Sequence, residues 1–271
     1  MTGSPSPSAR TGGTPVWIDG EGPTLLMAHG VLMDHRMWAP LVDLLADRYR
    51  IVRFDMLGHG QASDPPGQRT LDDFLGQVDE VITAHSPDPP VLIGFSMGGL
   101  IAQAYAVRSA FKLRGLVLMN AVYDRSETEQ QTVRTRRRLM HDEGAEGAIG
   151  SARERWFSLE ERDARSNETE GILEWIREGD FAPKMKAYEV FATGDRETLG
   201  RLGDVNVPAL VMTGADDSGS TPRMTRAMAQ ALPAATCYIA PGQRHMMPVM
   251  DAPGIARVLH EFLDALPQSP A

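Results

Sequence analysis

Short apolar runs alternate with amphipathic stretches through the first 120 residues of the chain. The apolar runs lack polar alternation, which is typical of strands that are buried on both faces of a parallel sheet. The stretches between the runs repeat apolar residues at helical spacing. We therefore predict an α/β fold with a mostly parallel sheet flanked by helices. The predicted strands cover 25–28, 51–54, 91–93 and 115–119, and the predicted helices cover 37–48, 71–84 and 100–110.

The strand pattern stops after Tyr123 and charged sequence with helix-forming character continues to about Asp204. Several glycines interrupt this segment and predict breaks between helices. We predict that residues 123–204 form a helical cap inserted into the sheet core. The glycines are Gly144, Gly150, Gly179 and Gly194.

The strand pattern returns after the cap, at 207–214 and 236–240, and a final helix is expected to begin near Ala252. The sheet core is therefore expected in two parts, 15–122 and 205–267. The 271 residues, of which 42% are hydrophobic, suffice for one large core with a small lid.

The two ends of the chain are expected to lie outside this core. Residues 1–14 are rich in Ser, Pro, Gly and Thr and predict a disordered tail without a targeting signal, and 268–271 form a short C-terminal tail. Only 16–18 looks strand-like before the turn at 19–23. The sheet is therefore expected to have eight strands, or seven if the first is missing.

The most informative motif follows the strand at 91–93 and reads Gly94-Phe-Ser96-Met-Gly98. A strand that turns sharply into a helix holds the serine in a strained backbone conformation, and glycines two residues away let the chains pass closely. This G-x-S-x-G pattern is a nucleophile elbow. It predicts that Ser96 is exposed to a substrate as a nucleophile.

A serine hydroxyl needs a base to take its proton, and the base needs an acid to orient it. Downstream, Asp216 and Asp217 follow the strand at 207–214, and His245 follows the strand at 236–240. The chain therefore supplies Ser, Asp and His in that order, with His245 as the candidate general base.

The order Ser, Asp, His resembles that of the α/β-hydrolases, and the resemblance extends from about Pro15 to Leu266. His29-Gly30 after a strand, the loop at 55–63 and the strand start Val207-Pro208 agree with it. The chain is most similar to the branch of carboxylesterases, 3-oxoadipate enol-lactonases and cofactor-free haloperoxidases. The residues that indicate this branch are 29–38 and 155–157.

The resemblance implies a role for several positions. Asp217, the third residue after Gly214, corresponds to the triad acid; Asp216 and Asp124 remain alternatives. The oxyanion hole is expected from the amide of Met97, directly after the nucleophile, and from the amide of Val31.

Aromatic and thioether side chains of the cap are expected to cover an apolar pocket above Ser96. Arg155 is a candidate partner for a substrate carboxylate, the alternative being a solvated arginine on a charged cap. The expected pocket residues are His29, Leu32, Phe95, Trp156, Trp175 and Met246.

Charge and composition argue against other functions. The chain has 36 acidic and 27 basic residues, so the basic run at 134–138 indicates a solvated helix face and not a nucleic-acid site. Gly58-His59-Gly60 lacks the spacing of a nucleotide-binding loop, and we expect no cofactor. No apolar run approaches the ~20 residues of a membrane span. We therefore expect a cytoplasmic protein with no nucleic-acid or membrane partner.

The remaining histidines and the single cysteine carry no predicted chemistry. The histidines lack metal-ligand spacing, so we expect no metal site and side chains that are exposed or partly buried. Cys237 is predicted to be a small core residue. The histidines concerned are His35, His85, His141 and His260.

Together these features predict a serine hydrolase that cleaves a small ester or lactone. A homo-oligomer is one alternative for its oligomeric state, which the sequence leaves open. The alternatives are a carbon–carbon bond hydrolase of a ring-fission diketo acid, a thioesterase or a perhydrolase. A non-catalytic module that binds a small ligand is a more remote alternative.

Overall fold

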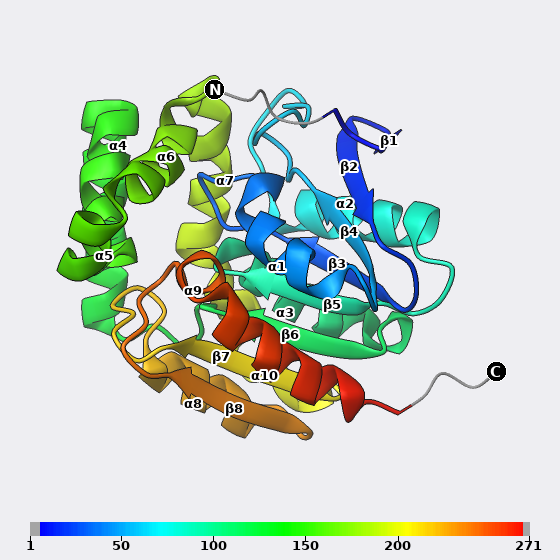
Figure 1. The fold of residues 1–271 in the computed structure, drawn as a ribbon. Coiled ribbons are helices and arrows are strands. Elements are labelled where there is room, and N and C mark those ends of the chain that lie inside the picture. Colours follow the sequence, from blue (N-terminus) through cyan, green and yellow to red (C-terminus); the bar gives the residue numbers. More distant parts are fainter. Residues whose placement is uncertain (1–5, 268–271) are drawn as a thin grey trace.

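An eight-stranded sheet forms the centre of the computed structural model, which describes residues 6–267 (Figure 1). The strand order is β1-β2-β4-β3-β5-β6-β7-β8. The β1–β2 and β2–β4 pairs are antiparallel and all other pairs are parallel, which confirms the predicted fold class. The strands are β1 (Ala9–Thr11), β2 (Thr14–Asp19), β3 (Thr24–Ala28), β4 (Arg50–Phe54), β5 (Val91–Phe95), β6 (Gly115–Met119), β7 (Ala209–Gly214) and β8 (Ala235–Ala240).

The first two strands correct the prediction of a disordered tail over 1–14. Thr11 pairs with Thr14, so Gly12-Gly13 forms a two-residue hairpin loop, and Gly12 has a φ of 56°. Glycine adopts positive φ at low cost, and a Gly-Gly pair is a hairpin signal. The first strand is therefore present. Residues 1–5 and 268–271, which were also predicted to be tails, lie outside the described residues.

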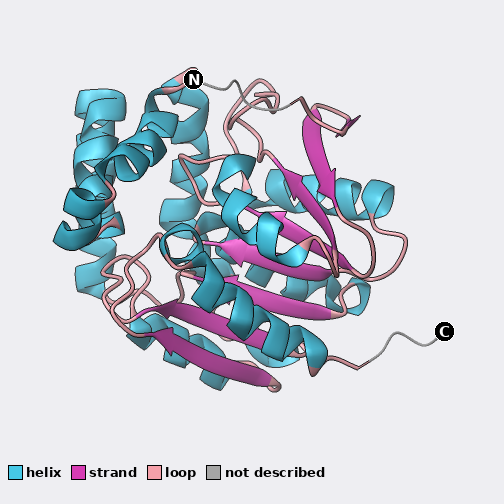
Figure 2. Cartoon of the chain, viewed as in Figure 1, coloured by secondary structure: helices cyan, strands magenta, loops and turns pink. Residues whose placement is uncertain are grey.

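Helices cover both faces of the sheet (Figure 2). The α1 and α10 helices pack against each other on one face, and α2 packs against α3 on the other. A capping box between Thr70 and Asp73 fixes the start of α2. The helices of the core are η1 (His35–Trp38), α1 (Ala39–Leu45), α2 (Leu71–His85), α3 (Met97–Ser109), η2 (Ala110–Lys112), α8 (Pro222–Ala231), α9 (Met247–Met250) and α10 (Ala252–Asp264).

Between β6 and β7 the described chain is helical, in the segment assigned to the cap. Capping boxes at Ser126 and Ser158 start α4 and α5. Gly144, with a φ of 62°, bends α4 sharply, because only glycine adopts this conformation at low cost. The helices of this predicted cap are α4 (Glu127–Trp156), α5 (Leu159–Ala164), α6 (Ser166–Arg177), α7 (Phe181–Thr193), η3 (Gly194–Glu197) and η4 (Leu202–Asp204).

Two predictions about burial are wrong. Cys237 is exposed, because β8 is the edge strand of the sheet and part of it faces solvent. His35 is buried, because its ring stacks on Trp17 with the ring centroids 3.4 Å apart.

Within residues 6–267, no helix combines the length and apolar character that a membrane crossing requires.

Candidate active site

Ser96 lies at the junction of β5 and α3, in the geometry expected of a nucleophile elbow. Its φ of 54° is unusual for a residue with a side chain. A Cβ on Gly94 would clash with the Gly98 carbonyl, and one on Gly98 would clash with the Ala28 carbonyl. The two glycines therefore allow the close approach of strand and helix that holds Ser96 in this conformation.

Asp217 and His245 meet at the carboxyl ends of β7 and β8. His245 Nδ1 lies 2.7 Å from Asp217 Oδ2. With the Nδ1 proton directed at the carboxylate, Nε2 is left as an acceptor. Ser96 and His245 line the same pocket. The ring of Trp156 stacks over His245 with the centroids 6.2 Å apart, which places a cap residue against the candidate base.

The surroundings of Asp217 keep its carboxylate ionised. Burial alone would raise its pKa, but the nearby His245 and hydrogen bonds from Asn120 and the Ser220 amide lower the pKa to about 2. Asn120 Nδ2 donates at 2.8 Å, the Gly219 amide at 2.8 Å and the Ser220 amide at 3.0 Å. A negative charge therefore faces the His245 ring at any pH near neutrality.

The two alternative acids lie elsewhere. Asp216 is exposed, and its amide donates to the Gln243 carbonyl. Asp124 is also exposed, and its carboxylate lies 4.0 Å from Arg223. In the described structure neither carboxylate contacts His245. Asp217 is therefore the candidate acid that the geometry favours.

Val31, in the turn after β3, lines the pocket and has an amide without an acceptor among residues 6–267. The Leu32 amide donates to His59 Nε2 at 3.1 Å, and Leu32 has a φ of 69°. The amides of Val31 and Met97 donate no hydrogen bond within residues 6–267. Two such donors are what an oxyanion requires.

Two buried histidines support this turn. His29 Nδ1 donates to the Gly30 carbonyl at 2.8 Å, and its Nε2 accepts from the Met56 amide at 2.9 Å. Burial lowers the pKa of His29, and burial together with His29 lowers the pKa of His59 to about 3. Both rings are therefore neutral and hold the backbone by hydrogen bonds.

The pocket lining agrees with only part of the predicted set. Leu32, Phe95 and Trp156 line the pocket. His29 is fully buried below the turn, and Met246 is fully buried in the core. Trp175 lies on α6 in a separate pocket, where the Arg36 guanidinium stands 5.0 Å from its ring centroid.

Several lining residues were not found from the sequence. Arg136 and Met140 line the pocket together with Arg155. Helical spacing does not indicate which face of a cap helix turns toward the core. Asn120, which holds Asp217, carried a usable signal because it directly follows a buried parallel strand.

A model of the alpha/beta hydrolase family matches residues 25–258. The chain belongs to this family. A relative from Acinetobacter baylyi, named (E)-2-((N-methylformamido)methylene)succinate hydrolase, is 29% identical over 248 residues, covering 92% of this chain and 93% of the relative. From the same organism, 3-oxoadipate enol-lactonase 1 is 26% identical over 200 residues, covering 73% of each chain. These matches confirm the predicted resemblance to α/β-hydrolases.

A solved structure gives the same result for the three-dimensional fold. The enol-lactonase from Burkholderia xenovorans LB400 superposes with a TM-score of 0.82 at 25% identity. The match covers 93% of this chain and 96% of that chain. The fold of this α/β-hydrolase is therefore similar to that of an enol-lactonase over most of the chain.

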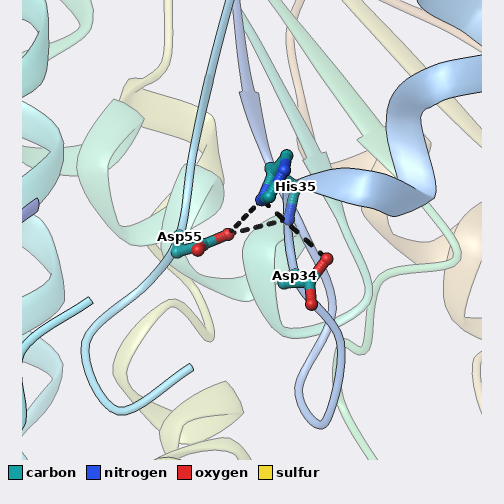
Figure 3. A group of neighbouring side chains, drawn as sticks. All are labelled: Asp34, His35 and Asp55. Carbon is teal, nitrogen blue, oxygen red and sulfur yellow. Dashed lines mark hydrogen bonds and ion pairs between the residues drawn. The ribbon is translucent and has the colours of Figure 1, made fainter. Parts of the chain in front are cut away.

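Away from Ser96, the α/β-hydrolase has a buried cluster of Asp34, His35 and Asp55 (Figure 3). Their potential ligand atoms lie within 4.8 Å of one another, so the expectation that His35 has no such neighbours is wrong. Asp55 Oδ1 accepts from the His35 amide at 2.9 Å and lies 2.8 Å from His35 Nδ1, and Asp34 pairs with Arg36 at 2.6 Å. These carboxylates are occupied by protein partners. The cluster joins the end of β4 to η1.

Proposed function

We propose that this α/β-hydrolase is a serine hydrolase that cleaves a small ester or lactone through an acyl-enzyme on Ser96. The observation that carries the proposal is the 2.7 Å contact between His245 Nδ1 and Asp217, with His245 lining the pocket that also contains the strained Ser96. An α/β-hydrolase that carries a histidine–aspartate pair beside an elbow serine has the groups that acyl transfer requires.

The proposed reaction begins when His245 Nε2 takes the proton of Ser96 Oγ and the serine attacks the carbonyl carbon. The amides of Met97 and Val31 hold the resulting oxyanion. The carbonyl then re-forms as His245 gives its proton to the leaving oxygen, which leaves an acyl group on Ser96. His245 next activates a water, which attacks the acyl group, and Ser96 recovers its proton from His245.

Asp217 has two roles in this scheme. Its hydrogen bond fixes the ring of His245 with Nε2 toward the serine, and its charge stabilises the protonated ring that forms during each step. The low pKa of Asp217 supports this assignment because the carboxylate stays charged. Asn120 and the amides of the loop after β7 hold the carboxylate in place.

The named relatives support a hydrolytic activity. One is a hydrolase of a methylene-succinate derivative, and others are an enol-lactonase and a methyl ester esterase. Ser96 and His245 are each about 5% exposed or less, so the cap leaves little access to the site. This enclosure favours a small substrate.

The test is hydrolysis of 4-nitrophenyl valerate and of δ-valerolactone by wild type, Ser96→Ala and Ser86→Ala. We expect Ser96→Ala to lower kcat/KM by about 10³-fold or more on whichever compound wild type cleaves. Ser86, at the end of α2, is the matched serine control and should behave as wild type. Hydrolysis by Ser96→Ala at the wild-type rate would overturn the proposal.

A further inference from the structure

The pocket around Ser96 carries positive charge although the chain as a whole is acidic. Arg136 and Arg155 both line it, and the described lining contains no Asp or Glu. The chain has a net charge of −9. Two guanidinium groups in a pocket lining that contains no carboxylate are therefore a local exception to the overall charge.

The bend in α4 brings the two arginines together. Arg136 precedes Gly144 and Arg155 lies in the last turn of the same element. A Cβ placed on Gly219 would lie 3.1 Å from Arg155 Nη1 and 3.8 Å from Arg136 Nη1. Both guanidinium groups therefore approach the same point of the loop that carries Asp217.

Several other arginines of α4 have carboxylate partners, but within residues 6–267 these two do not. Arg153, for example, makes two hydrogen bonds to Glu170. Arg155 uses only Nε, which donates to the carbonyl and hydroxyl oxygens of Ser151, and among the described residues its Nη atoms have no acceptor. Arg136 Nε is buried and has no partner in the same part of the chain.

The two guanidinium groups repel each other, and the nearby carboxylate of Asp217 offsets only part of the cost of charging Arg155. Burial and the proximity of Arg136 lower the pKa of Arg155 to about 9, so the side chain is still charged at neutral pH. The carboxylate of Asp217 is already held by several donors, including His245. The Tyr188 hydroxyl, on a side chain that is 4% exposed, lines the same pocket and has no hydrogen-bond partner among residues 6–267.

We propose that Arg136 and Arg155 bind a free carboxylate of the substrate, so that the preferred substrates are esters or lactones of dicarboxylic acids. The planar forks of two guanidinium groups match the two oxygens of a carboxylate, and charge-assisted hydrogen bonds of this kind are the strong ones. The Tyr188 hydroxyl is a third donor within the pocket. This substrate class rests on the proposed serine hydrolase function.

The test compares two esters with the same leaving group and nearly the same length. 4-Nitrophenyl hemiglutarate carries a carboxylate where 4-nitrophenyl valerate ends in a methyl group. With spontaneous hydrolysis subtracted, wild type should show at least about a tenfold higher kcat/KM for the hemiglutarate. Arg136→Gln and Arg155→Gln should each lower this ratio by about tenfold or more, mainly through KM. Arg153→Gln, with its partner Glu170 outside the pocket, should leave the ratio unchanged.

Two results would overturn the inference: a wild-type ratio of one or below, or a ratio that neither glutamine variant changes. Circular dichroism establishes that each variant is folded. Arg155→Lys keeps the charge and loses the fork, so it should restore only part of the ratio.

Binding of glutarate to Ser96→Ala, measured by calorimetry, tests carboxylate recognition without catalysis. Adding Arg155→Gln to this variant should weaken glutarate binding by about tenfold or more. If neither ester is hydrolysed but glutarate binds in this way, the proposed catalytic function fails and the carboxylate site stands. If the esters are hydrolysed and glutarate does not bind, the carboxylate site fails alone.

Discussion

His245 Nδ1 lies 2.7 Å from Asp217 Oδ2, and the two residues come from loops that follow neighbouring parallel strands. The hydrogen bond occupies one nitrogen of the ring, and in the proposed scheme the other nitrogen takes the proton of Ser96. Because β7 and β8 end at the same edge of the sheet as β5, Ser96 and His245 reach one pocket although they are far apart in sequence, and Asp217 contacts the ring of His245. Catalysis in the proposed scheme depends on this contact.

Asp217→Asn tests the orienting role of the acid. The amide keeps the shape of the side chain but favours the wrong tautomer of His245, so we expect kcat to fall by about 10³–10⁴-fold with little change in the fold. Steady-state hydrolysis of 4-nitrophenyl valerate measures this. Asp216→Asn is the matched control at the exposed neighbouring position and should retain wild-type kcat. Equal losses in the two variants would refute the assignment of Asp217.

The elbow glycines should be intolerant of any side chain. Gly98→Ala places a methyl group against the Ala28 carbonyl, so we expect a loss of about 3 kcal/mol or more in the free energy of unfolding. Gly76→Ala is the matched control. Its position in α2 is exposed with no atom within 4 Å of the added Cβ, so it should gain about 0.5–1 kcal/mol. Urea denaturation distinguishes these outcomes, and a tolerated Gly98→Ala would contradict the elbow geometry.

The elbow could be predicted from sequence because it depends on a short local pattern. The other candidate residues could be predicted because each lies shortly after a predicted strand. Gly94, Ser96 and Gly98 lie within five residues, and a strand–turn–helix needs that spacing. The hairpin at Gly12-Gly13 carried a local signal of the same kind, but composition outweighed it in the prediction of a tail.

The pocket lining could not be predicted because it depends on how the cap packs. Trp175 is an aromatic residue of the kind expected to line a pocket, yet its ring packs against Arg36. Arg136, a charged residue, lines the pocket instead. The bend at Gly144 decides which face of α4 meets the core. His35 similarly meets Asp55 only because β3 and β4 pair in parallel, which brings the segments after them together.

The stability of the protein should fall in acid partly because of His59. Its pKa is about 3 in the folded state and near 6.5 when unfolded, so below pH 6.5 the unfolded chain binds a proton that the folded chain excludes. The free energy of unfolding should therefore fall by about 1.4 kcal/mol for each pH unit between 6.5 and 3 from this residue alone.

Urea denaturation of wild type and His59→Gln between pH 6 and pH 4 measures this contribution. In the variant, the free energy of unfolding should fall less steeply as the pH decreases. The slope should be smaller by the contribution of about one proton, whatever the absolute stability of the variant. His141→Gln, at an exposed position on α4, is the matched control and should keep the wild-type slope. An unchanged slope in His59→Gln would show that His59 does not stay neutral in the folded protein.

The most direct test of the central claim is the intact mass of the protein after treatment with a fluorophosphonate, for wild type beside Ser96→Ala. Activated serines form a stable phosphonyl adduct because they attack phosphorus as they attack a carbonyl. We expect one adduct per wild-type chain, located on Ser96 by peptide mapping, and none on Ser96→Ala. A folded wild type that stays unlabelled, or a Ser96→Ala variant that labels equally, would contradict the assignment of Ser96 as the nucleophile.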